Sequence, residues 1–461
     1  MRFALFSAVL LAACGDDPVD PGPEPGVPVE VSITGASAAL VQGDVVALQA
    51  SVLDGNGDAV ARAITWSLSP AGAGLLSDIG RLVAYQAGTV SVIATADGLA
   101  DTAAISVTAR GLSGSFTIVG GADRTDGDNL DFWIVGSHAL SGTRFIDGSR
   151  TDAVILAWDV STPAAPFVTD SVIIPALRLN DVKIRADGAF AVGTREVVDE
   201  GGIDFIGLAD PAHPTHQFFL TDQAMAAGVH NVWIEGDIVY VATDATGSPS
   251  GMRIVDASLG VPAVVGGFEI PSADGPLHDI YVRDGLAFLS YWDEGLVILD
   301  VGGGGAGGAP TAPVELSRID LDGNTHNAWY WPATGYVFVG EEDFQRPGIV
   351  RIVDASDPTA PELAATITFP GQTPHNFWLD EAREILYIGW YGEGLVAVDV
   401  SGQLAGDLRL GGRIITSLRY DGGAANCFDG ASTCTFAPQI VGDNIWVMDL
   451  NNGLRALRPD F

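Results

Sequence analysis

Short apolar stretches alternate with turn-forming residues at a regular interval through residues 129–461. In one unit of this pattern, the alternation of apolar and polar positions predicts four strands, at His230–Ile234, Ile238–Thr243, Met252–Asp256 and Val264–Ile270. The third apolar stretch ends in Asp in most units, with Gly207 as the exception, and these residues are Asp159, Asp256, Asp300, Asp354 and Asp399. Four strands in about 48 residues match one propeller blade, so we expect an all-β chain.

Seven such units fit between residues 110 and 461, and the last of them lacks a fourth strand. An apolar stretch at residues 115–119 precedes the first unit and has no place in it. A ring closed by this N-terminal strand would complete the last unit and leave no exposed β-edge. We therefore expect a seven-bladed β-propeller over residues 110–461, in which the Gly-rich segment 302–308 is a flexible loop between two strands of one blade.

The first strand of four consecutive units opens with a histidine followed by Asn or Asp, and the pairs are His230-Asn231, His278-Asp279, His326-Asn327 and His375-Asn376. Equal positions in successive blades meet around the axis, so the four histidines are expected to form a partial ring at one mouth of the channel. These eight residues are the candidate ligand-binding residues. Neutral imidazoles gathered in this way bind copper, zinc or iron. The alternative is a structural role, in which each pair bonds the backbone of the neighbouring blade.

Other side chains lie close to these pairs in the repeat. Aromatic residues follow the pairs at equal positions and are expected to pack between blades, with sugar stacking as an alternative: Trp233, Tyr281, Trp329 and Trp378. Acidic runs at residues 291–294 and 341–343 are placed where loops between second and third strands emerge. Beside a histidine ring such loops can bind cations, calcium included, whereas elsewhere they form solvated surface.

The third strand of the unit resembles the LVIVD repeat. The stretches that carry the resemblance are Gly295-Leu296-Val297-Ile298-Leu299-Asp300-Val301, Gly348-Ile349-Val350-Arg351-Ile352-Val353-Asp354 and Gly394-Leu395-Val396-Ala397-Val398-Asp399. The resemblance covers most of residues 129–461 and implies a β-propeller of a bacterial surface protein. Units one, two and seven depart from the pattern because none of them has the histidine, which leaves three positions of the ring open.

Residues 29–109 have a different pattern. Alternation at residues 29–33, 45–52 and 89–96 predicts the strands of a two-sheet sandwich. The segment resembles a bacterial Ig-like domain of group 2 in its Gln42-Gly43-Asp44 turn, its Ile64-Thr65-Trp66-Ser67 strand and its closing Gly88-Thr89-Val90 strand. The resemblance implies an Ig-like β-sandwich that precedes the propeller.

The first residues indicate export. Arg2 precedes an apolar run that ends at Ala13 and is too short to span a bilayer, which is typical of a cleaved signal at residues 1–13. The tetrad Leu11-Ala12-Ala13-Cys14 resembles a bacterial lipobox, which implies lipidation of Cys14 and a membrane anchor, and Gly15 favours the outer membrane. Residues 14–28 are rich in Asp, Pro and Gly and are expected to form an extended tether.

Composition and cysteine usage narrow the function. The net charge of −36 argues against nucleic acid or an anionic lipid surface as a partner, because both would be repelled. In an exported chain, Cys427 and Cys434 are expected to form a disulfide that closes a surface loop. Signatures of serine hydrolases, phosphate-binding loops, zinc proteases and haem attachment are absent.

Two functions follow from these features. We expect a non-enzymatic binding or scaffolding module of the cell envelope, facing the periplasm or the exterior, with a protein or glycan partner. The alternative is a metal-dependent oxidoreductase that uses His230, His278, His326 and His375 as metal ligands. Some histidine-bearing propellers, such as the selenium-binding protein and methanethiol oxidase group, are metal-dependent, but that likeness is one of architecture only.

Overall fold

The computed structural model describes residues 26–37, 39–122, 128–144, 152–196, 200–243, 250–271, 273, 275–344, 348–369, 371, 373–420, 427–428 and 430–461. The fold is all-β as expected: these residues contain no α-helix, and their one helical turn is the 3₁₀ segment η1 (Met225–Ala227). Within the described ranges, no helix is long and apolar enough to cross a membrane. The chain divides into two compact units: the first comprises residues up to 40 and residues 46–108, and the second comprises residues 41–45 and 109–461.

Three antiparallel sheets make up the first unit. Their strand orders are β2-β9-β8-β5, β3-β7-β6 and β1-β4. The strands are β1 (Pro28–Thr34), β2 (Ala39–Val41), β3 (Val45–Ala47), β4 (Gln49–Asp54), β5 (Thr65–Ser69), β6 (Gly74–Leu76), β7 (Arg81–Ala84), β8 (Gly88–Ala96) and β9 (Leu99–Thr108). Alternate residues of β8 point into a core that includes Leu82, Val90, Val92 and Ile105, as the period-two pattern predicts.

Seven antiparallel sheets make up the described part of the second unit, six of which follow the chain in order. The first three consist of β11 (Asp128–Val135), β12 (His138–Arg144), β13 (Ala153–Asp159), β14 (Phe167–Ile174); β15 (Val182–Ile184), β16 (Phe190–Arg195), β17 (Gly202–Gly207), β18 (Thr215–Leu220); and β19 (Val229–Glu235), β20 (Ile238–Thr243), β21 (Gly251–Asp256), β22 (Ala263–Glu269). The last of these sheets matches the four strands predicted for its unit to within one residue at most ends.

The next three sheets repeat this order. They consist of β23 (Leu277–Arg283), β24 (Leu286–Tyr291), β25 (Gly295–Asp300), β26 (Val314–Ile319); β27 (Thr325–Trp331), β28 (Tyr336–Glu341), β29 (Ile349–Asp354), β30 (Glu362–Thr368); and β31 (Phe377–Asp380), β32 (Ile385–Trp390), β33 (Gly394–Asp399), β35 (Ile414–Leu418). The short strand β34 (Gly406–Asp407) adds to the second of them, parallel to β30.

The seventh sheet joins the two ends of the unit. It contains β36 (Thr435–Val441), β37 (Asn444–Asp449) and β38 (Gly453–Pro459), and its fourth strand is β10 (Phe116–Ala122). β10 pairs antiparallel with β38, from Phe116 opposite Pro459 to Ala122 opposite Leu454. The prediction that the stretch at residues 115–119 completes the last unit is confirmed by this pairing.

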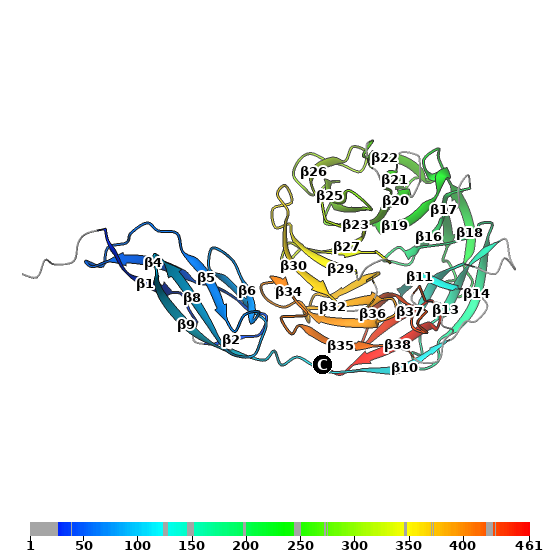
Figure 1. The fold of residues 1–461 in the computed structure, drawn as a ribbon. Helices are drawn as coiled ribbons and strands as arrows, with labels where there is room; N and C mark the ends of the chain where they lie inside the picture. The colour runs from blue at the N-terminus through cyan, green and yellow to red at the C-terminus, as the bar shows by residue number, and fades with distance from the viewer. Residues whose placement is uncertain are drawn as a thin grey trace, which may run out of the picture. The chain divides into compact units, whose positions relative to one another are not determined.

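The sheets follow one another around a common centre, with cyan β10 beside red β38 (Figure 1). We call β11, β15, β19, β23, β27, β31 and β36 the inner strands, because each contacts the next in this order and β36 contacts β11. Clusters of buried apolar residues fill the spaces between successive sheets. The second unit is therefore a propeller-like ring, in which equal positions of the repeat are brought to one centre.

The Gly-rich segment 302–308 lies between β25 and β26, as predicted, but it is organised around a single carboxylate. Five backbone N–H groups donate to the Asp300 side chain, from Gly302, Gly303, Gly304, Ala306 and Gly308. The sequence did not predict this organisation, in which the loop wraps a carboxylate acceptor. The glycines allow so many N–H groups to converge, since they adopt backbone conformations that other residues disfavour.

Candidate functional site

Each of the seven sheets contributes one residue to the same level of the ring, on its inner strand or, for Asn180 and His375, two residues before that strand. These residues, which we call the histidine tier, are Leu130, Asn180, His230, His278, His326, His375 and Phe436. The four predicted histidines are therefore consecutive members of one tier. The open positions of the ring are filled by Leu130, Asn180 and Phe436.

A β-bulge sets the direction of three of these histidines. In β19, Val229 pairs with Thr243 and Asn231 pairs with Ala242, so His230 has no partner across the strand pair. The same shift in register occurs at His278 in β23 and at His326 in β27. Bulges redirect a side chain out of the regular pleat, and here they direct the imidazoles toward the same space.

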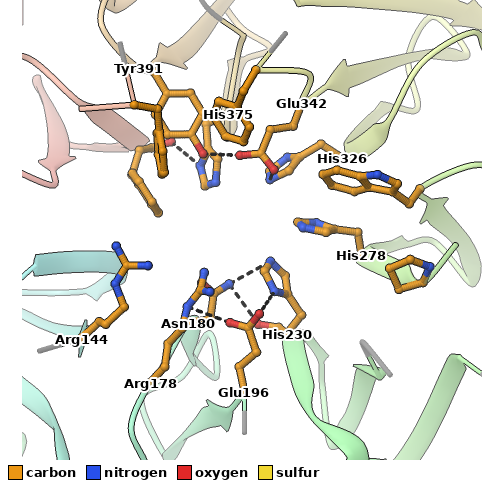
Figure 2. Close-up of a pocket in the computed structure, with 15 residues that line it drawn as sticks. Arg144, Arg178, Asn180, Glu196, His230, His278, His326, Glu342, His375 and Tyr391 are labelled. Carbon is orange, nitrogen blue, oxygen red and sulfur yellow. Dashed lines mark hydrogen bonds and ion pairs between the residues drawn. The ribbon is translucent and has the colours of Figure 1, made fainter. Parts of the chain in front are cut away.

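The four imidazoles form a continuous row. Neighbouring ring centroids lie 3.9 Å apart for His230 and His278, 4.5 Å for His278 and His326, and 4.4 Å for His326 and His375. All four side chains are buried. The structure thus brings together the histidines that the repeat predicts to meet (Figure 2).

A second set of residues reaches the same space from the ends of the second strands. We call them the exit residues: Arg144 ends β12, and Glu196, Trp292, Glu342 and Tyr391 directly follow β16, β24, β28 and β32. Sequence reasoning missed Arg144, Glu196 and Tyr391. These residues could have been predicted, because the position at the end of the second strand recurs in each unit of the repeat. Sequence reasoning had placed Glu342 in an acidic loop near the histidines, and Glu342 is buried rather than solvated.

The histidine tier except Leu130, together with the exit residues, surrounds a cavity of about 300 Å³. Its wall also includes Arg178, Pro276 and two exposed aromatic side chains, Phe344 and Phe428, whose rings lie 4.6 Å apart. A cavity of this size with converging polar groups is typical of a small-ligand site.

His230 is held by the neighbouring sheet. Its Nδ1 lies 3.0 Å from Glu196 Oε1, and its Nε2 lies 3.0 Å from Nδ2 of Asn180. Arg178 completes this group, because its Nε lies 2.8 Å from Glu196 Oε2 and its guanidinium donates to Asn180 Oδ1. Burial raises the pKa of Glu196, but the nearby His230 and Arg178 lower it by more. The net pKa is below the usual value, so this carboxylate is ionised at neutral pH.

His375 is also engaged by protein. Its Nδ1 lies 3.0 Å from the carbonyl oxygen of Phe436 in the next sheet, as the structural alternative expected for every pair. Burial lowers its pKa to about 3, so the ring is neutral at pH 7.

His278 and His326 differ from the other two. Among the described residues, the buried Nδ1 atom of each ring has no hydrogen-bond partner. Burial and the neighbouring imidazoles lower the pKa of both rings well below the usual value, so both are neutral at pH 7. A buried polar atom without a partner costs about 1–3 kcal/mol, which calls for an explanation in the function of the site.

Glu342 faces these two rings. Its Oε2 lies 3.8 Å from His326 Nε2, while Oε1 accepts a hydrogen bond from the Tyr391 hydroxyl. Burial raises the pKa of Glu342 to about 7, although the Tyr391 hydrogen bond acts against the shift. Single ligand atoms of His278, His326 and Glu342 all lie within 4.8 Å of one another.

The Asn and Asp residues of the pairs lie one level further along the channel and mostly tie sheets together. Asn327 donates to the His375 carbonyl oxygen at 3.0 Å, and Asn376 donates to Asp131 at 2.9 Å. With Asn231 and Asp279 they line a second cavity of about 40 Å³. Burial raises the pKa of Asp279 to about 7. These contacts favour the structural role for this half of the pairs.

The aromatic residues that follow the pairs form a closed ring rather than separate contacts between blades. Trp133 joins the four predicted residues, and successive ring centroids lie 5.8, 4.5, 5.0, 5.1 and 5.6 Å apart in the order Trp133, Trp233, Tyr281, Trp329, Trp378 and back to Trp133. The partly buried Trp233 and Trp329 also pack on the clusters between sheets. Trp133, Trp233, Trp329 and Trp378 line the second cavity, so the ring of aromatic residues narrows the channel there.

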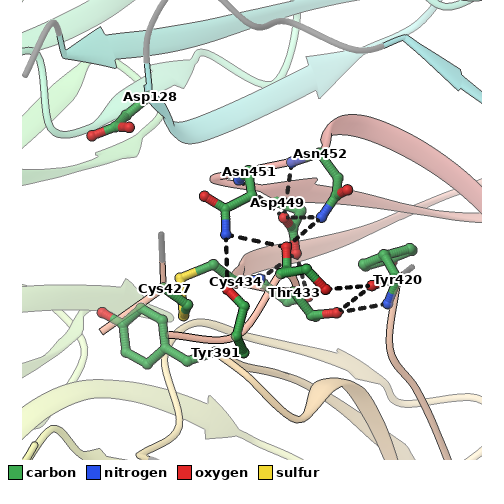
Figure 3. Close-up of a disulfide and its surroundings, with 12 residues drawn as sticks. Asp128, Tyr391, Tyr420, Cys427, Thr433, Cys434, Asp449, Asn451 and Asn452 are labelled. Carbon is green, nitrogen blue, oxygen red and sulfur yellow. Dashed lines mark hydrogen bonds between the residues drawn. A yellow bond between two sulfur atoms is a disulfide. The ribbon is translucent and has the colours of Figure 1, made fainter. Parts of the chain in front are cut away.

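Cys427 and Cys434 form a disulfide beside the main cavity (Figure 3). Both sulfur-bearing residues are buried in the apolar cluster that contains Tyr391, so the bridge fixes the loop to the core as well as closing it. Phe428, which follows Cys427, contacts Tyr391 with ring centroids 5.2 Å apart. The disulfide thereby positions an aromatic residue at the rim of the cavity.

The predicted signal and Cys14, the predicted lipidation site, lie outside the described residues, as does most of the predicted tether at residues 14–28. Comparison with known proteins gives one family: the LVIVD repeat matches residues 274–320, a segment that includes β23 to β26 and His278. No curated protein matches the chain.

Proposed function

We propose that this chain is an exported, lipid-anchored binding protein of the bacterial envelope, whose seven-bladed LVIVD-type propeller takes a small ligand in the histidine-lined cavity. Seven antiparallel sheets in cyclic contact support the propeller at residues 110–461. Sheets packed over one core support an Ig-like spacer at residues 29–109. The apolar run before Cys14 supports the signal peptide at residues 1–13 and the anchor.

One observation carries the binding function. The cavity of about 300 Å³ collects buried polar groups from successive sheets, and two of them, His278 and His326, have a nitrogen without a partner among the described residues. Residues that serve only the fold are expected to be satisfied by the fold. A cavity that leaves them unsatisfied is preorganised for a ligand.

The binding function is tested by native mass spectrometry of the protein purified from the envelope. We expect a non-covalently bound mass that is released on denaturation. Pro276→Trp places an indole on the cavity wall and should lower the occupancy by roughly 10-fold or more, because the ligand and the indole compete for the same volume. Pro163→Trp, in the turn between β13 and β14, is the matched control and should leave it unchanged. Equal occupancy in both variants would contradict the proposal.

The anchor is tested separately by metabolic labelling with a radioactive fatty acid. We expect label on the wild-type chain and none on Cys14→Ser, with release of that variant from the membrane fraction. Equal labelling of the two chains would exclude lipidation at Cys14.

The competing function, a metal-dependent oxidoreductase, is favoured by the approach of His278, His326 and Glu342 to one another. Two imidazoles and a carboxylate occur at catalytic zinc and non-haem iron centres. Oxidation of a reduced substrate by the metal-loaded chain, lost in Glu342→Gln, would favour this function over simple binding. Metal loading without turnover would leave the binding function in place.

A further inference from the structure

We propose that His278, His326 and Glu342 bind one divalent transition-metal ion of the zinc, iron or copper class. This inference rests on the proposed function, because it names the class of ligand that the same cavity takes. It also narrows the four-histidine set expected from the repeat to two histidines and one carboxylate that the repeat pattern did not include.

The first step is to separate the histidines by what holds them. His230 and His375 have partners in adjacent sheets: Glu196 and Asn180 for the former, and the Phe436 carbonyl oxygen for the latter. His278 and His326 are 7% and 3% exposed, yet Nδ1 of each lacks a hydrogen-bond partner of good geometry among the described residues, although the Asn327 side chain lies close enough to His326 to raise its pKa. The two central histidines of the row are therefore the ones with a ring nitrogen that the surrounding protein does not hydrogen-bond.

The second step is the distance between the candidate ligand atoms. Ligands bonded at about 2.0–2.2 Å to a tetrahedral ion lie roughly 3.4 Å from one another. Nε2 of His326, the nitrogen opposite its unpartnered Nδ1, lies 3.8 Å from Glu342 Oε2, and one atom from each of the three side chains fits within 4.8 Å. Rotations of the side chains that move these atoms by about 1 Å bring them to bonding distance. Figure 2 shows His278, His326 and Glu342 grouped on one side of the cavity.

The third step is the support behind the carboxylate. The Tyr391 hydroxyl donates to Glu342 Oε1, which leaves Oε2 directed toward His326. Tyr391 is itself fully buried and contacts the apolar cluster that contains the disulfide. Hydrogen bonds of this kind orient ligating carboxylates in metal sites, so Tyr391 is a positioning residue of the proposed site.

The fourth step is the open side of the site. Three protein ligands leave at least one position of a four-coordinate ion free, and the cavity adjoins all three side chains. Imidazole favours transition metals over Mg²⁺ and Ca²⁺, which prefer an all-oxygen shell. Arg178 and Arg144 lie across the cavity from the three side chains, as Figure 2 shows, so the free position of the ion could take water or an anionic group.

The test uses the full chain with Cys14→Ser, stripped of metal and titrated with Zn²⁺ in a calorimeter. A millimolar excess of Mg²⁺ occupies the surface carboxylates of this acidic protein, which has a net charge of −36. We expect one Zn²⁺ per chain, and visible absorption bands of a four- or five-coordinate ion when Co²⁺ replaces it. A chain that takes up no stoichiometric Zn²⁺ would overturn the inference.

Three variants assign the ligands. The double variant His278→Gln, His326→Gln should lose roughly 100-fold or more in Zn²⁺ affinity, and Glu342→Gln should change the Co²⁺ spectrum as well as weaken binding. Tyr391→Phe should weaken binding by roughly 10–100-fold, the usual effect of removing a hydrogen bond to a ligand. His213→Gln is the matched control, because His213 is an exposed histidine paired with Asp170. If the double variant fails to fold, Glu342→Gln alone decides, since unchanged Zn²⁺ affinity and Co²⁺ spectrum in it would overturn the site.

The outcomes also separate this inference from the binding function. A chain that binds no metal but carries a small solute in native mass spectrometry would overturn the metal site and retain the proposed function. A chain that holds neither would overturn both. Retention of Zn²⁺ by the double variant would place the ion elsewhere and also reject the inference.

Discussion

At the scale of single residues, the most unusual group is the chain's only lysine. Lys183 is buried near the centre of the ring, where its Nζ lies 3.2 Å from Asp131 Oδ2 and also pairs with Asp181. Burial, and then the like charge of Asp181, raise the pKa of Asp131 to about 6 even though Lys183 acts to lower it. The ammonium group of Lys183 thus offsets the negative charge of the buried carboxylates of Asp131 and Asp181.

The sign of the resulting pH dependence follows from linkage. The pKa of Asp131 is higher in the folded protein, at about 6, than its reference value of 3.8, so the folded state binds more protons between these values. The contribution of Asp131 to stability therefore falls as the pH rises from about 4 to about 6. Removal of the lysine increases this effect, because the carboxylates then lose their counter-charge.

We expect Lys183→Met to lower the free energy of unfolding by about 3–5 kcal/mol at pH 8, as is typical when one partner of a buried ion pair is removed. The loss should be smaller at pH 5, where Asp131 takes up a proton. Urea unfolding followed by tryptophan fluorescence at both pH values measures the difference. Arg185→Met is the control, because the Arg185 pairs with Asp187 and Asp237 are on the surface and their loss should change the stability little at either pH. An equal loss at both pH values would contradict the expectation.

At the scale of elements, the repeated Asp at the end of the third strand has a defined local role. The carboxylates of Asp159, Asp256, Asp354 and Asp399 each accept the N–H group two residues further on, which fixes the turn into the fourth strand. Asp300 makes the same bond and accepts four further N–H groups from its glycine-rich loop. An Asp at this position of the repeat thus supports turns of different length.

This difference gives a matched pair of substitutions. We expect Asp300→Ala to lower the free energy of unfolding by about 2–3 kcal/mol, because buried hydrogen bonds to a charged group are lost together. Asp256→Ala, which removes only the exposed bonds to Ser258, should lower the free energy of unfolding by clearly less. Guanidinium unfolding measures both, and hydrogen exchange of residues 302–308 should increase only in Asp300→Ala. A cost for Asp256→Ala as large as that for Asp300→Ala would refute this account.

At the scale of the whole molecule, the ring depends on a pairing between strands more than 300 residues apart in the chain. β10 covers the edge of β38, and β36 contacts β11. Without β10 the N–H and C=O groups of β38 would form an open edge, which favours association with another chain.

We therefore expect two truncated chains to behave differently. A chain that starts at Ala109 retains β10 and should be monomeric, with one cooperative thermal transition. A chain that starts at residue 123 lacks β10 and should unfold at a lower temperature and associate in a concentration-dependent way. Light scattering and calorimetry measure these properties. Two indistinguishable monomers would show that the pairing of β10 with β38 does not stabilise the ring.

The sequence by itself determined the strands and the unit that repeats. The period-two pattern placed β19 to β22 nearly to the residue, since burial of one face fixes alternation locally. The repeat also predicted that four histidines would meet, because equal positions of equal units are related by the geometry of the ring. The unpaired stretch at residues 115–119 even predicted the closing strand.

The tertiary structure alone decided which of those histidines are free to bind a ligand. His230 and His375 have partners that are distant in sequence or are backbone atoms, such as Glu196 and the Phe436 carbonyl oxygen. Glu342 and Tyr391 reach the cavity from different sheets, and only the packing of those sheets brings their side chains together. A repeat pattern specifies position within a unit, whereas hydrogen bonding between units depends on side chains that do not repeat.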